Sequence, residues 1–203
     1  MKVLISLIVV MFLFTVTQSW ADTGTGLLTY PLEVKQKTLT TEFTGVTSTG
    51  GGVGVQGRFT MKPSRQFSFD AGIGIAGGEY SSKLFVSGDY EIFPDYMKQP
   101  RFSIRTAFEN AKEGSYRKNI LSLAPVISKG MSFWGKEAYP FASMPIALNL
   151  NNDKNTYRTT IDLNMGLAMK LPIKQSNLLG TIETSIGLKD SNTGFALGVA
   201  YSL

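Results

Sequence analysis

The chain has 203 residues, of which 43% are hydrophobic and 17% are charged, and its formal net charge is +5. It contains neither Cys nor His, which excludes a disulfide framework, thiolate metal sites, a Cys nucleophile and the commonest general base. This length suits one domain with at most a small appendage.

The first 21 residues have the layout of a secretory signal peptide. Lys2 forms a short positive region, residues 3–16 form an apolar run, and Ser19 and Ala21 occupy the small-residue positions of a cleavage site. The apolar run is shorter than the ~20 residues that a membrane-spanning helix needs. We therefore expect residues 1–21 to be removed on export.

Residues 22–37 follow as a segment without a strand pattern, which we expect in the periplasm. The sequence leaves open whether this segment is a tail, a plug or an additional strand. No metal ligand set, cofactor motif or catalytic constellation is predicted in it or in the rest of the chain.

Residues 38–203 alternate between apolar and polar side chains, as in Val53, Val55 and Phe59 with Gln56 and Arg58 between them. A period of two indicates strands with one apolar face. The intervening segments are rich in Gly, Pro, Asn, Asp and Ser, which favours hairpin turns. The predicted strands are 38–47, 53–62, 66–76, 83–93, 101–110, 119–128, 138–150, 157–170, 178–188 and 195–203.

These ten strands, linked as neighbouring hairpins, predict an all-β, antiparallel, up-and-down arrangement. Pro125, Pro140 and Pro145 weaken the strand assignments within residues 119–150, because proline cannot donate to a strand ladder. Two strands fewer in this stretch would leave eight.

Such a meander suits either a soluble barrel with its apolar face inward or a membrane barrel with its apolar face outward. Several strands reach the ~9–11 residues that a tilted membrane strand needs. The opposite face carries charges, at Glu42, Arg58, Asp70, Asp89, Glu91, Arg105, Glu109, Asp162 and Glu183. It also carries small residues, at Gly54, Gly72, Gly74, Gly166, Ala168, Ser185, Gly187, Gly198 and Ala200, which suit a narrow barrel interior.

The C-terminal strand is the most specific feature. Gly198, Tyr201 and Leu203 match the Gly-x-x-aromatic-x-hydrophobic pattern that ends the last strand of bacterial outer-membrane β-barrel proteins. Leu203 stands where Phe is commonest in that pattern, and Ala196 where a polar residue is usual. The chain thus resembles this class, in particular its small OmpA- and OmpX-like members. The resemblance implies a transmembrane barrel over residues 38–203, inserted into the outer membrane by the barrel-assembly machinery.

The predicted interior holds seven acids against bases such as Arg58, Arg101, Arg105, Arg158 and Lys170. A barrel of eight to ten strands is narrow enough for side chains to fill, and opposite charges inside it would pair. We therefore predict a mostly closed, charge-paired lumen and a structural or envelope-integrity role without catalysis. A narrow ion or small-solute channel is the alternative, and a soluble periplasmic barrel that binds a hydrophobic ligand is the second.

Basic residues cluster near the predicted outer rim. Lys112, Arg117, Lys118, Lys154 and Arg158 could contact lipopolysaccharide phosphates or form a generic charged rim. We expect outer-membrane lipid as the partner, no nucleic acid, and a monomer.

Overall fold

The structure is a computed structural model that describes residues 26–47, 52–77, 80–113, 115–133, 135–151, 156–171, 173 and 177–203. The predicted signal peptide lies outside the described residues. Among the described residues, no helix is both long enough and apolar enough to span a membrane.

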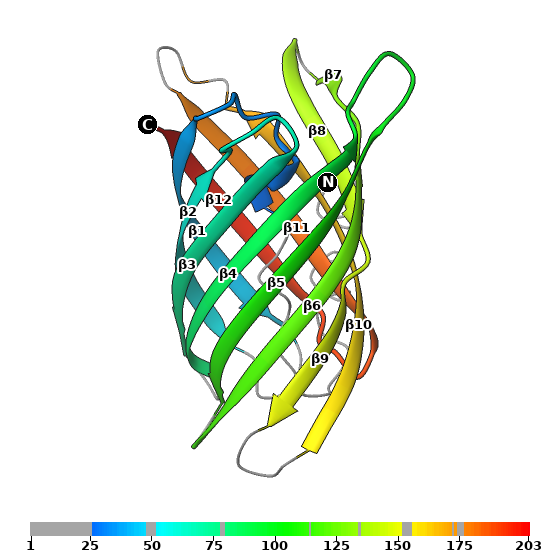
Figure 1. Ribbon diagram of the computed structural model, residues 1–203. Coiled ribbons are helices and arrows are strands. Elements are labelled where there is room, and N and C mark those ends of the chain that lie inside the picture. Colours follow the sequence, from blue (N-terminus) through cyan, green and yellow to red (C-terminus); the bar gives the residue numbers. More distant parts are fainter. Residues whose placement is uncertain are drawn as a thin grey trace, which may run out of the picture.

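Antiparallel strands wrap around a single axis and close into a barrel (Figure 1). A short 3-10 helix, η1 (Gly26–Thr29), precedes them. The strands are β1 (Lys37–Val46), β2 (Val53–Met61), β3 (Phe67–Ala76), β4 (Tyr80–Phe93), β5 (Arg101–Glu113), β6 (Tyr116–Ser128), β7 (Met131–Phe133), β8 (Lys136–Ser143), β9 (Ile146–Asn151), β10 (Thr156–Lys170), β11 (Leu178–Lys189) and β12 (Gly194–Ser202).

Ten strands form the wall among the described residues. Strands β8 and β9 both pair with β6 and β10 in one continuous register, so they are two parts of one wall strand interrupted at Met144 and Pro145. Strand β7 pairs only with the first residues of β8, and this short hairpin projects beyond the wall. The prediction of ten strands is confirmed, and the alternative of eight is wrong.

The barrel closes between its first and last strands. Thr38 of β1 pairs with Ser202 of β12, and Val46 pairs with Gly194. Because β1 begins where β12 ends, the chain enters and leaves the wall at the same end of the barrel, which we call the terminal end. The opposite end, which carries the β5–β6 and β11–β12 turns, is called the distal end.

The period of two in the sequence separates the two faces of the wall. On β1, Thr40 and Glu42 are buried inside, whereas Leu39 and Phe43 are exposed outside. The soluble alternative needs the apolar face inside, so it is wrong for this chain.

Glycines inside the wall make room for aromatic rings on neighbouring strands. Gly72 of β3 pairs with Phe85 of β4, and a Cβ at Gly72 would lie 2.5 Å from the ring and 2.3 Å from a backbone oxygen. Gly166 of β10 pairs with Phe141 of β8, where a Cβ would lie 2.5 Å from that ring. Small interior residues are thus needed because two phenyl groups occupy their space.

Candidate functional site

The centre of the lumen holds a network around Arg58. Its guanidinium contacts Asp70 at 2.8 Å and Glu42 at 3.1 Å, and its side chain is 1% exposed. Arg105 lies 3.5 Å from the same Asp70 carboxylate. The Ser87 hydroxyl donates to Asp70 at 2.6 Å and accepts from Arg105 at 2.9 Å. These five side chains come from the neighbouring strands β1 to β5, so paired charges line this half of the lumen in one layer.

Two further residues complete this central layer. Gln56 donates to Glu42, and Phe85 lies under the Arg58 guanidinium at 5.0 Å from ring centroid to Cζ. Arg58 reaches across because its register partner on β3 is Gly72, which has no side chain to block it. Sequence reasoning missed Gln56, Ser87 and Phe85, since a neutral or aromatic residue on an inward position gives no charge signal.

A second network lies nearer the terminal end. Arg101 contacts Asp89, and its Nε lies 2.8 Å from Glu91. The Ser103 hydroxyl donates to Asp89 at 2.7 Å. All four side chains belong to β4 and β5, which are paired along their lengths.

The remaining predicted lumen acids are buried but lie on other parts of the wall. Glu109 of β5, Asp162 of β10 and Glu183 of β11 are each 4% exposed or less. Asp162 accepts a hydrogen bond from the Ser191 hydroxyl, and Glu183 interacts electrostatically with Arg58. The nine predicted charges therefore all face the interior, in more than one cluster.

Two bases assigned to the lumen interior lie instead at its mouths. Arg158 is 58% exposed at the distal end, where it pairs with Asp190 at 2.5 Å. Lys170 is exposed at the terminal end. Both have the inward parity of β10, but they stand at the two ends of that strand, which periodicity alone does not distinguish.

The buried charges of the described interior do not balance. Six carboxylates are buried against four cations, so the buried groups include two more acids than bases. The carboxylates are Glu42, Asp70, Asp89, Glu109, Asp162 and Glu183, and the cations are Arg58, Lys83, Arg101 and Arg105. Sequence reasoning left Lys83 out of this set.

The opposite side of the lumen, on β10 and β11, carries neutral polar groups beside the buried carboxylates of Asp162 and Glu183. Asn164 is fully buried, and neither atom of its amide has a hydrogen-bond partner. The hydroxyl of Ser185, its register partner on β11, is also buried without a partner. Buried polar atoms of this kind normally bond to protein or to ordered water.

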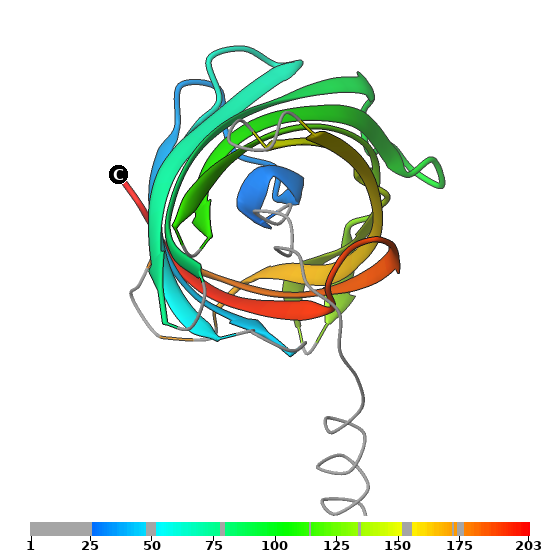
Figure 2. The same ribbon diagram turned by 90° about the horizontal axis from the view of Figure 1, so that it is seen from below.

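The N-terminal segment lies inside the barrel at the terminal end, where η1 is seen within the ring of strands (Figure 2). Leu28 and Leu32 are 4% exposed or less, and Leu32 packs with Leu179 and Ala200 of the wall. The Tyr30 ring meets the Tyr139 ring edge-on, at 5.2 Å between centroids. Of the three options that the sequence left open, the described part of this segment occupies the place of a plug.

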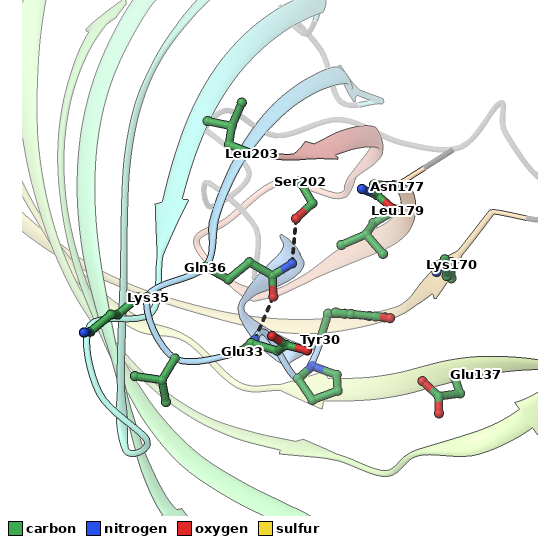
Figure 3. Close-up of a pocket in the computed structure, with 12 residues that line it drawn as sticks. Tyr30, Glu33, Lys35, Gln36, Glu137, Lys170, Asn177, Leu179, Ser202 and Leu203 are labelled. Atoms are coloured by element: carbon green, nitrogen blue, oxygen red, sulfur yellow. Dashed lines mark hydrogen bonds between the residues drawn. The ribbon is translucent and has the colours of Figure 1, made fainter. Parts of the chain in front are cut away.

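A cavity of about 620 Å³ separates the segment from the wall (Figure 3). Gln36 bridges one side of it, donating to the Ser202 hydroxyl at 2.7 Å and accepting from the Glu33 amide at 2.7 Å. Burial of Tyr30, and to a smaller extent the nearby Glu137 carboxylate, raises the pKa of the Tyr30 phenol. The cavity thus has a fixed polar side.

Of the three residues of the C-terminal pattern, Gly198 and Tyr201 lie on opposite faces of β12 and Leu203 follows its last residue. Tyr201 and Leu203 point outward and are 53% and 67% exposed. Gly198 faces inward, where a Cβ would lie 2.4 Å from the Thr181 hydroxyl.

The outer surface of the wall is mostly apolar. Large hydrophobic side chains more than 40% exposed occur on most wall strands, including Leu39, Val55, Ile73, Leu84, Phe108, Leu121, Ile146, Met165, Ile182 and Leu197. Charges are buried and hydrocarbon is exposed, the reverse of a water-soluble protein, so the wall suits an apolar solvent. The protein is a ten-stranded membrane β-barrel.

No protein-family model and no curated protein sequence matches the chain. Its fold is similar to a de novo designed transmembrane β-barrel, with 15% identity, a TM-score of 0.43, and coverage of 85% of this chain and 99% of that chain. It is also similar to the KdgM porin, solved in complex with disordered oligogalacturonate, with 14% identity, a TM-score of 0.43, and coverage of 82% of this chain and 99% of that chain. The N-terminal barrel domain of Pseudomonas aeruginosa OprF is similar with 12% identity, a TM-score of 0.36, and coverage of 84% of this chain and 98% of that chain. At these identities the likeness concerns the fold alone.

Proposed function

We propose that the protein is a non-enzymatic barrel of the bacterial outer membrane, with a lumen closed by its own charge pairs and a structural role in the envelope. The observation that carries this proposal is the central network, in which Arg58, Asp70 and Glu42 have side chains 3% exposed or less. In a water-filled pore these groups would be hydrated. Their burial fits a lumen filled by side chains, as expected for a narrow barrel.

Pairing makes this closure energetically reasonable. Removing a charge from water costs roughly several kcal/mol of free energy unless an opposite charge or a hydrogen bond compensates it. Arg58 meets two carboxylates, and Asp70 meets two guanidinium groups and a hydroxyl. Opening the lumen would require these contacts to separate together.

The N-terminal segment supports the same conclusion at the terminal end. It brings Leu28, Leu32 and Tyr30 into the barrel mouth, where they pack on the wall. A solute entering from this end would first meet the segment and then the charge network.

The outer-membrane location rests on two features of the chain. Residues 1–21 have a signal-peptide pattern, and Gly198, Tyr201 and Leu203 form the C-terminal pattern that implies the barrel-assembly machinery as a partner. The location puts the terminal end in the periplasm and the distal end outside. We further propose that the barrel is a monomer with lipid, and no nucleic acid, around it.

The absence of catalysis is part of the proposal. Histidine is the side chain that most readily gains and loses a proton near neutral pH, and the sequence has none. Of the interior carboxylates that could take its place, Glu42, Asp70 and Asp89 are each paired with a guanidinium group.

Fractionation and solute uptake test this function. The full-length protein, expressed in a Gram-negative host, is expected in the outer-membrane fraction with a heat-dependent shift in SDS gels, because its backbone hydrogen bonds close within the barrel. Liposomes that contain it should swell in small sugars no faster than empty liposomes. Recovery in the soluble fraction would contradict the location, and porin-like swelling would contradict the closed lumen.

A narrow channel is the second candidate, and Asn164 and Ser185 favour it. Their unpartnered polar atoms lie on neighbouring strands of one side of the lumen. If water molecules form hydrogen bonds with these atoms, a row of water molecules would follow β10 and β11 through the lumen. Small, steady ion currents without sugar uptake would support this candidate over full closure.

A further inference from the structure

The outer face of the β5–β6 hairpin carries two cations near the distal end. Lys112 and Arg117 are register partners, and both are exposed. Neither has a carboxylate partner among the residues that the structure describes. Inward positions on β5 are odd-numbered and those on β6 are even-numbered, as Arg105 and Ser122 show, so both cations project from the outer surface.

Arg117 is held in place by a chain of amides. Its Nη1 donates to Asn110 Oδ1 at 2.5 Å, and Asn110 Nδ2 donates to Asn119 Oδ1 at 2.7 Å. Asn110 and Asn119 are the register pair two residues below Lys112 and Arg117. A guanidinium fixed at one nitrogen still presents its other N–H groups, in the planar geometry that phosphate oxygens accept.

Two apolar hollows begin directly below this polar pair, at Phe108 and Leu121. The first has about 370 Å³ and lies over Gly88, between Phe67 and Phe108. Gly88 leaves the outer face without a side chain at this point, which explains the hollow.

The second hollow lies on the other side of Leu121 and continues the first. It has about 270 Å³ and is lined by Leu123, Ile146 and Leu148. Thr106 and Leu121 line both hollows. The pair Phe108–Leu121 is two residues from the pair Asn110–Asn119, or roughly 7 Å along an antiparallel strand.

We propose that this face binds one lipopolysaccharide molecule, with a phosphate of its lipid A on Arg117 and Lys112 and acyl chains in the two hollows. Cations at the rim and apolar hollows beneath them match an anionic headgroup that carries several acyl chains. The choice of lipopolysaccharide, an outer-leaflet lipid, rests on the proposed function, which places the distal end outside. The central charge network takes no part in this site.

Native mass spectrometry of the mature protein in non-ionic detergent tests the proposal, with diphosphoryl lipid A as the probe. The wild-type barrel is expected to retain one lipid A. The K112Q/R117Q variant should bind about tenfold more weakly, since two charge-assisted contacts are lost. The matched control R65Q/K98Q removes two exposed cations from the turns at the terminal end and should bind like the wild type.

The hollows are tested by T106F, which fills space in both. It should weaken lipid A retention several-fold, whereas T184F, an exposed threonine on the outer face of β11, should not. Both variants place a phenyl group on an outward position, so a folding defect would appear in both.

Three results would overturn the proposal. They are equal retention by K112Q/R117Q and R65Q/K98Q, equal binding of lipid A from which both phosphates have been removed, and preferential retention of phosphatidylglycerol or of a second barrel. The measurement does not depend on where the protein is found in cells. Failure here with an outer-membrane location intact would remove the lipid site alone.

Discussion

The two sides of the lumen are lined by different kinds of side chain. On β1 to β5 the interior is ionic, with Arg58 and Arg105 between carboxylates of three strands. On β10 and β11 the interior holds the carboxylates of Asp162 and Glu183, and Asn164 and Ser185 between them have polar atoms without protein partners. Both sides nevertheless use the same packing device, a phenyl ring over a glycine.

This difference separates a part of the lumen that is joined by ion pairs from a part in which polar atoms have no protein partner. Charges that are buried and paired cannot be removed singly without cost. An unpartnered amide can be replaced by an apolar group at little cost, because it makes no hydrogen bond to the protein that the substitution would break. The following variants separate these two situations, from the largest expected effect to the smallest.

The largest effect is expected for R58A. The substitution leaves Glu42 and Asp70 without their shared cation, which should lower the free energy of unfolding by about 3–5 kcal/mol. Unfolding by guanidinium chloride in detergent micelles measures this change in free energy. E42Q/R58A/D70N, which also neutralises the two acids, should recover part of the loss. An effect of R58A as small as that of the exposed R65A would contradict the pairing.

Glycine substitutions test the packing that the two sides share. G72A and G166A should each lower the free energy of unfolding by about 1–3 kcal/mol, because a Cβ would lie within 2.5 Å of backbone oxygen and of a phenyl carbon. G57A is the matched control, since nothing lies within 4 Å of its Cβ position. Equal stability of all three variants would show that the rings do not occupy this space.

N164L tests the unpartnered polar atoms on β10 and β11. We expect the free energy of unfolding to change by no more than about 1 kcal/mol, in the stabilising direction, because the buried amide has no protein partner. Guanidinium unfolding of N164L beside the N149L control, whose amide donates to Thr160 at 3.3 Å, gives the comparison. A loss above about 2 kcal/mol for N164L would mean that its amide is bonded within the lumen.

The smallest effect concerns a turn at the terminal end. Burial raises the pKa of Asp95, but hydrogen bonds from Lys129 and the Gly130 amide outweigh burial and hold that pKa below its usual value. A depressed pKa in the folded state stabilises the protein above the ordinary carboxyl pKa, and this stability is lost as the pH falls through the lowered value.

We expect this contribution to be about 0.5 kcal/mol, since the pair is partly exposed. Unfolding at neutral pH and at pH below the ordinary carboxyl pKa should differ less for D95N than for the wild type. The same pH dependence in both proteins would show that Asp95 carries none of it.

The strands and the inward charges were predictable because both follow from a period of two. Partners were not, because pairing depends on register between strands. Arg158 and Lys170 share the inward parity of Asp162, yet they lie at the mouths. The place of η1 was not predictable either, since four residues without periodicity do not specify a distant wall.

The central claim is that the charge network closes the lumen, and single-channel recording in planar bilayers tests it most directly. We predict that the wild-type barrel shows no steady openings. The E42Q/R58A/D70N variant, in which alanine replaces the central arginine, should conduct small steady currents. Sizeable steady currents from the wild type, equal to those of the variant, would contradict the claim.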